Sequence, residues 1–99
     1  MYKLAIQAAV PNQQDAQYNW DFVLKAVSWP TVPRKGDFLD LDLPDFPMEY
    51  EVQKVRHHFP LCGGRPLIVV WVHIERELYE HLCKDDEWSS TFTDEFDCI

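Results

Sequence analysis

The residues best suited to chemistry are four histidines and three cysteines, and their spacing decides whether they can act together. His57 and His58 are adjacent, Cys62 follows in a Cys-Gly-Gly-Arg turn, and Arg65 supplies a cation. A cysteine nucleophile needs a neighbouring base or cation that stabilises its thiolate. Consecutive residues of a strand point to opposite faces, and the sequence has no GxSxG, P-loop, dinucleotide-binding or HExxH motif. We therefore predict that the protein is not an enzyme, and keep a small enzyme or ligand pocket around His57, His58 and Cys62 as an alternative.

A metal site would need a closed set of ligands, and the sequence offers only a weak one. Glu77, His81 and Asp85 fall at i, i+4 and i+8 and would share one face of a helix. Carboxylates and imidazole can bind a divalent ion, but salt bridges with Arg76 and Lys84 on a solvated face explain the same pattern. The cysteines show no CxxC spacing. We expect neither a metal ion nor a cofactor.

Acidic residues dominate the charge of the chain and are unevenly placed. The 99 residues include 17 Asp and Glu against 9 Lys and Arg, for a formal net charge of −8. Such a charge repels phosphate backbones and anionic lipid, so we expect no direct nucleic-acid or membrane partner. Carboxylates are concentrated between Asp37 and Glu51 and again from Glu75 onward. Between these blocks lies a basic patch made of Lys54, Arg56, His57, His58 and Arg65.

The C-terminal segment combines carboxylates with aromatic residues at regular spacing. Trp88, Phe92 and Phe96 are four residues apart and would form one stripe on a helical turn. A stripe of this kind is typical of a peptide that lays an apolar face in a groove. Packing of the same aromatics on the protein's own core is the competing interpretation. The predicted partner-binding surface contains Asp85, Asp86, Glu87, Trp88, Phe92, Asp94, Glu95, Phe96 and Asp97.

These features favour a small protein-interaction module that binds a protein partner through an acidic and aromatic surface. We expect a cytoplasmic protein, because the odd number of cysteines suits free thiols in a reducing compartment and no secretory signal is present. A homo-oligomer is compatible with the same features. An alternative function is inhibition of a DNA- or RNA-binding protein by mimicry of nucleic acid. Alternate strand carboxylates such as Asp40 and Asp42 lie about 7 Å apart, close to the phosphate spacing along one strand.

The residues that would form these sites must be positioned by short strands, because prolines and glycines divide the chain into strand-length segments. Tyr2 to Val10 alternates in polarity and predicts a half-buried strand. Trp20 to Ser28 fits both a strand and a helix, and we favour a strand because a turn-rich link at 33–37 follows it. Leu39 to Leu43 alternates cleanly and predicts a third strand.

The second half of the chain predicts two more strands and a helix. Between Met48 and Pro60 the apolar phase changes, which predicts a β-bulge near Gln53 and Lys54. The segment 67–74 is apolar at both parities and predicts the central strand. Residues 75–87 predict a helix that covers this strand through Ile74, Leu78 and Leu82.

The predicted fold is therefore mainly β (α+β): a five-stranded antiparallel, bent, small-barrel-like sheet with one C-terminal helix packed on it. Residues 1–87 are expected to form a single domain, and residues 88–99 an acidic and aromatic tail or arm.

Overall fold

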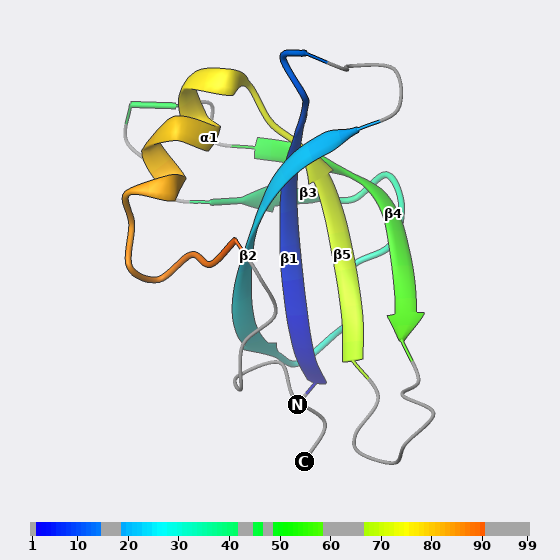
Figure 1. The fold of residues 1–99 in the computed structure, drawn as a ribbon. Helices are drawn as coiled ribbons and strands as arrows, with labels where there is room; N and C mark the ends of the chain where they lie inside the picture. Colours follow the sequence, from blue (N-terminus) through cyan, green and yellow to red (C-terminus); the bar gives the residue numbers. More distant parts are fainter. Residues whose placement is uncertain (1, 15–18, 42–44, 47–48, 59–66, 91–99) are drawn as a thin grey trace.

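Five strands form a curved sheet that closes halfway into a barrel, and one helix packs on it (Figure 1). The computed structural model describes residues 2–14, 19–41, 45–46, 49–58 and 67–90. The elements are β1 (Tyr2–Pro11), β2 (Trp20–Trp29), β3 (Phe38–Asp40), β4 (Glu49–His58), β5 (Leu67–His73) and α1 (Arg76–Cys83). The mainly β fold class predicted from the sequence is confirmed, and the ambiguous segment at 20–28 is a strand.

The strand order is β2-β1-β5-β4-β3, which puts the predicted central strand β5 in the middle. All neighbours are antiparallel except β1 and β5, which run parallel. The prediction of an entirely antiparallel sheet is wrong for this pair. After the β1–β2 hairpin the chain crosses to the far edge, forms β3 and β4, and returns through β5 beside β1. Parallel neighbours require a long connection of this kind, and strand patterning alone does not reveal it.

The predicted bulge in β4 is confirmed, since the pairing with β5 shifts register between Val52 and Lys54. One extra residue restores the apolar side chains to the inner, concave face of the sheet. Val52 is fully buried there, and Val55 packs against the same core cluster in spite of its opposite parity. The bulge thus bends β4 and helps the sheet to curl.

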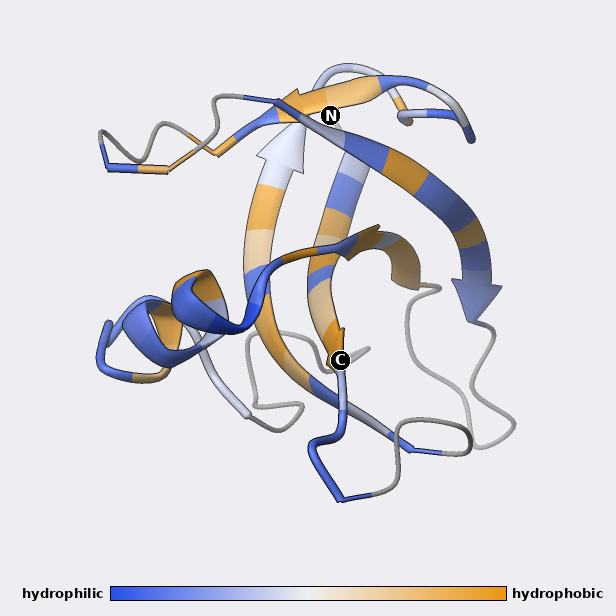
Figure 2. Cartoon of the chain, turned by 90° about the horizontal axis from the view of Figure 1, so that it is seen from above, coloured by the Kyte–Doolittle hydropathy of each residue, from blue (hydrophilic) through white to orange (hydrophobic). Residues whose placement is uncertain are grey.

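Strand β1 is buried on both faces, so the predicted half-buried strand is wrong in this respect. Leu4, Ala8 and Val10 are buried on the concave face, while Ala5 and Ala9 are buried on the outer, convex face. Figure 2 shows hydrophilic and hydrophobic residues alternating along the strands. This alternation predicts one buried face, and it therefore underestimates the burial of β1, which lies between β2 and β5 in the sheet. Alanine is compatible with either environment, so its positions carry little information in the sequence.

Leu78 and Leu82 of α1 are completely buried, as predicted, but the helix packs mainly on β1 and β2 and not, as predicted, on the central strand β5. It is shorter than the expected 75–87 and ends at Cys83. Carboxylates are unfavourable at the negative end of a helix dipole, and Asp85 and Asp86 follow directly. The Asp85 side chain instead accepts a hydrogen bond from the Glu87 N–H at 2.9 Å, which forms a turn.

Three hydrogen bonds hold the start of α1 against the sheet. The Tyr50 hydroxyl donates to Glu75 Oε1 at 2.7 Å, and burial followed by this hydrogen bond raises the pKa of Tyr50. Arg76 donates to Asp21 Oδ2 at 3.0 Å and to the Pro11 carbonyl. The hydrogen bond from Arg76 lowers the pKa of Asp21, with a further contribution from Asn12. These contacts join the start of α1 to β1, β2 and β4, which fixes the helix at one end of the half-barrel.

Candidate functional site

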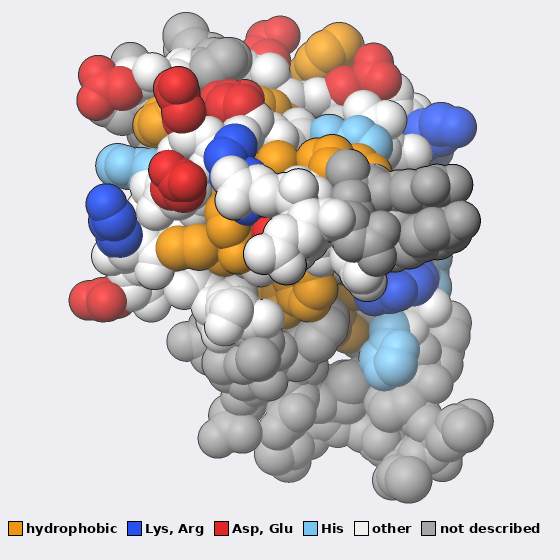
Figure 3. Space-filling view, turned by 45° about the horizontal axis from the view of Figure 1, so that its top comes forward, with side chains coloured by type: hydrophobic (Ala, Val, Ile, Leu, Met, Phe, Trp, Pro, Cys, Tyr) orange, Lys and Arg blue, Asp and Glu red, His pale blue; other side chains and the backbone are white. Residues whose placement is uncertain are grey.

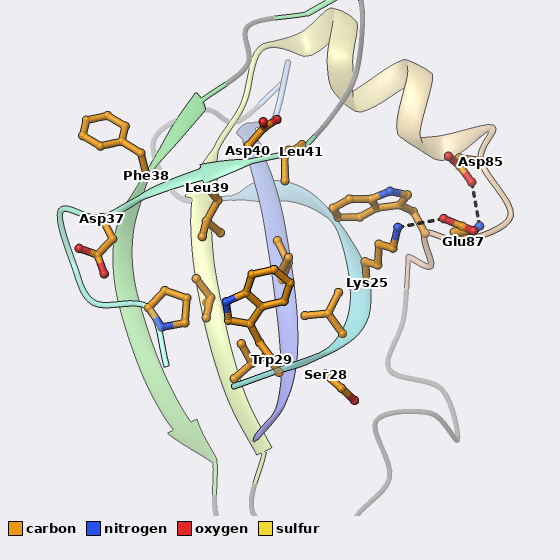
Figure 4. A pocket seen from close by; sticks show the side chains of 16 residues that line it. Lys25, Ser28, Trp29, Asp37, Phe38, Leu39, Asp40, Leu41, Asp85 and Glu87 are labelled. Carbon is orange, nitrogen blue, oxygen red and sulfur yellow. Dashed lines mark hydrogen bonds and ion pairs between the residues drawn. The ribbon is translucent and has the colours of Figure 1, made fainter. Parts of the chain in front are cut away.

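The half-barrel leaves a cleft of about 1010 Å³ on its concave side, between the two edge strands β2 and β3 (Figure 4). Strands β1, β2, β3 and β5 and the loop after α1 all contribute to it. The lining residues are Leu4, Ile6, Lys25, Val27, Ser28, Trp29, Pro33, Asp37, Phe38, Leu39, Asp40, Leu41, Val70, Asp85, Glu87 and Trp88. The edge strands β2 and β3 do not pair with each other, so the described strands leave the cleft open along one side.

The interior of the cleft is apolar because each strand directs one parity of side chains toward it. On β2 this parity includes Val27 and Trp29, and Trp29 is 55% exposed although it is one of the largest apolar side chains. Figure 4 shows Leu39 and Leu41 pointing from β3 toward Trp29, whereas the Phe38 ring points away. An exposed tryptophan facing two leucines across an open space is typical of a binding surface.

A tight turn positions β3 opposite β2. Gly36 adopts φ 93°, which favours glycine, and its N–H donates to the Val52 carbonyl at 2.9 Å. Asp37 Oδ2 accepts a hydrogen bond from the Arg34 N–H at 2.8 Å. Since Val52 immediately precedes the register shift of β4, the turn and the bulge together set the direction in which β3 leaves the sheet.

Carboxylates lie on two sides of the cleft. Asp37 and Asp40 lie on the β3 side, and Asp85 and Glu87 lie in the loop after α1. Among the described lining residues Lys25 is the only Lys or Arg, and its Nζ lies 2.9 Å from Glu87 Oε2. With its one lysine paired, the cleft presents a negative potential to a ligand.

Three of the predicted partner-binding residues reach this cleft: Asp85, Glu87 and Trp88. Trp88 also packs against the main core cluster, which agrees with the competing interpretation that this aromatic residue packs on the protein's own core. Asp86 is exposed in the turn and does not line the cleft. The other predicted residues, Phe92, Asp94, Glu95, Phe96 and Asp97, lie outside the described residues. Sequence reasoning missed Lys25 and Trp29, because their shared face is visible only once β2 is known to be an edge strand.

The predicted basic patch is divided between the two faces of β4. The pairing with β5 puts Lys54 and Arg56 on the convex face together with His58. His57 has the opposite parity and lines a second cavity of about 730 Å³. Arg65 and Cys62 lie outside the described residues. In the view of Figure 3 most carboxylates gather toward the upper left, on the side where α1 lies.

An aromatic cluster that the sequence did not predict adjoins this basic face. Lys54 Nζ lies 4.5 Å from the centroid of the Trp71 ring, a cation–π geometry. Trp20 stacks on His73 with ring centroids 4.6 Å apart. Trp20 comes from β2 and His73 from β5, so the contact crosses the intervening strand β1.

The environment of His73 makes stability dependent on pH. The side chain of His73 is exposed, but its partial desolvation, followed by the charge of Lys54, lowers the pKa of His73. The unfolded chain binds the proton near pH 6.5, so the folded protein is expected to lose stability as pH falls below that value toward the lowered pKa. Urea unfolding at about pH 7.5 and about pH 5.5 checks this difference. His73→Phe keeps an aromatic ring on Trp20 and should reduce the pH dependence, whereas the control His58→Gln, at another exposed histidine of the same face, should retain it. An unaltered dependence in His73→Phe would contradict the assignment to this residue.

Comparison with known proteins does not extend these observations: the chain matches no protein-family model, and neither the curated proteins nor the solved structures gave a similar protein. Within the part of the chain that the structure describes, no helix is long and apolar enough to cross a bilayer. In the same ranges, no three His, Cys, Asp or Glu side chains are grouped so that they could hold a metal ion. The two features from which function can be inferred are the cleft and the convex face on which Lys54 lies over Trp71 and Trp20 stacks on His73.

Proposed function

We propose that the protein is a non-enzymatic interaction module that holds an apolar, positively charged segment of a partner protein in the cleft between β2 and β3. The observation that carries this proposal is the combination of an exposed apolar interior with four surrounding carboxylates and one lysine that is already paired. The apolar interior supplies burial for aliphatic side chains, and the carboxylates favour Lys or Arg beside them.

The open side of the cleft favours an extended chain over a compact small molecule. Trp29 and Leu39 face each other from two strands that do not pair, so a segment can lie between them and continue past both ends. An enclosed pocket is the more usual site for a small ligand, because it buries most of the ligand's surface.

The proposal is tested with a fluorescein-labelled synthetic peptide of about ten residues in which valine and lysine alternate. We expect its fluorescence anisotropy to rise on titration with the protein, and a matched valine–glutamate peptide to bind much more weakly. Trp29→Ser should weaken binding of the valine–lysine peptide about tenfold or more, as for an anchor residue of an interface. Tyr2→Ser is the control, because Tyr2 is 50% exposed but lies outside the cleft. Equal binding of the two peptides, or an unchanged affinity in Trp29→Ser, would refute the proposal.

The contribution of charge is measured separately with Asp40→Asn, which removes one carboxylate from the cleft without changing the shape of the side chain. We expect binding about two- to fivefold weaker, since an exposed charge pair contributes up to about 1 kcal/mol. Glu80→Gln on the exposed face of α1 is the matched control. An acidic mimic of nucleic acid would behave differently: its binding would disappear at high salt and would not need Trp29.

A further inference from the structure

Resting on the proposed function, we infer that the partner segment binds as an added β-strand on the free edge of β2, at Ala26 and Ser28. Recognition would then combine backbone hydrogen bonds with the apolar and acidic contacts of the cleft. A partner of this kind is an extended segment in which one parity of side chains is apolar and Lys or Arg residues lie near its ends.

The hydrogen-bonding direction of β2 identifies the free groups. The N–H and C=O of Leu24 both bond to Ser89, at 2.7 and 2.8 Å, and therefore point away from β1. In an antiparallel strand, residues two and four positions further along direct their N–H and C=O the same way. Ala26 and Ser28 consequently present their backbone groups to the open edge, and the structure shows no hydrogen bond to these groups from any described residue.

The contact at Leu24 shows that this edge accepts a further strand. Ser89 forms an antiparallel bridge there through two backbone hydrogen bonds. The chain before Ser89 does not run along this edge, because the Trp88 N–H bonds to the Asp85 carbonyl at 3.1 Å and closes a turn. Pairing within the described chain therefore covers only one position of β2, and no described residue pairs with the next stretch of the same edge at Ala26 and Ser28.

The register of β2 also explains why such a strand would reach the cleft. Val27 and Trp29 point into the cleft from positions that alternate with Ala26 and Ser28. Every second side chain of a strand paired with this edge lies on the same face as those two residues. The added strand would thus place its apolar parity over Val27 and Trp29, near the carboxylates of Asp85 and Glu87.

The test removes a single outward-pointing N–H. Ser28→Pro deletes this donor but no hydrogen bond to β1, since the Ser28 amide faces the open edge. Ser28→Ala keeps the N–H and measures the contribution of the side chain alone, and we expect Ser28→Pro to bind the valine–lysine peptide about tenfold more weakly than Ser28→Ala does. Because proline can also disturb the end of β2, a second measurement uses the parent protein alone: amide hydrogen exchange at Ala26 and Ser28, which the bound peptide should slow.

The outcomes separate the two proposals. If the parent protein does not bind the peptide at all, the proposed function is refuted. If the peptide binds, depends on Trp29, but leaves exchange at Ala26 and Ser28 unchanged, the function stands and strand addition is refuted. A folded Ser28→Pro variant with undiminished affinity refutes strand addition in the same way. Slower exchange at both amides together with weaker binding to Ser28→Pro supports it.

Discussion

Replacing Leu82 by alanine is expected to lower the free energy of unfolding by about 3 kcal/mol, the usual cost when a buried leucine leaves a cavity. Leu82 is completely buried where α1 packs on the concave side of the sheet, in the same core cluster as Val52 and Val70. That side of the half-barrel is open between β2 and β3, so α1 supplies cover which a closed barrel would obtain from its own strands. Urea unfolding followed by tryptophan fluorescence measures the loss.

Glu80→Ala is the matched control for this substitution. Glu80 lies in the same helix and is exposed, and alanine slightly favours the helix. Its effect should stay within about 0.5 kcal/mol. If Leu82→Ala costs no more than Glu80→Ala, the described packing of α1 on the sheet is wrong.

Replacing Trp88 by alanine is expected to cost about 2 to 3 kcal/mol, although this residue follows the last helix and resembles the start of a tail. Its ring packs against the main core cluster and lies 5.9 Å from Lys25 Nζ. The next residue, Ser89, forms hydrogen bonds to Leu24 of β2 through both its backbone N–H and its backbone C=O. Thermal or urea unfolding of the variant measures the effect.

Trp29→Ala provides the comparison, because it removes the same side chain from a position that is 55% exposed. Its cost should stay below about 1 kcal/mol. Equal losses for the two variants would mean that Trp88 does not contribute to the core. The comparison also bears on experiments that shorten the chain: a deletion that begins at Trp88 would remove core packing, whereas one that begins after Ser90 keeps it.

Several features of the fold could be predicted because they depend on local patterns. The bulge at Gln53–Lys54 follows from the change of apolar phase within one strand. The central position of β5 follows from a run that is apolar on both parities. The burial of Leu78 and Leu82 follows from their i, i+4 spacing. In each case the signal lies within about ten residues, which is the range over which periodicity operates.

The candidate site was predicted only in part, because most of it is assembled from segments far apart in the sequence. The acidic and aromatic character of Asp85, Glu87 and Trp88 was visible in the sequence, and these residues line the cleft. Trp29 and Lys25 carried no distinguishing signal, since they join the cleft only through the position of β2 at the edge of the sheet. The stack of Trp20 on His73 likewise depends on β1 lying between β2 and β5.

The sequence by itself therefore determined that this is an acidic, mainly β protein with a bent sheet, a doubly buried central strand and a short amphipathic helix. Only the tertiary structure decided that β1 and β5 run parallel, that β2 and β3 remain unpaired across a cleft, and that Trp88 belongs to the core. The physical reason is that alternation and spacing record which side of a strand or helix is apolar. They do not record which strand lies beside it, and the order of the strands is what leaves an open edge in this sheet.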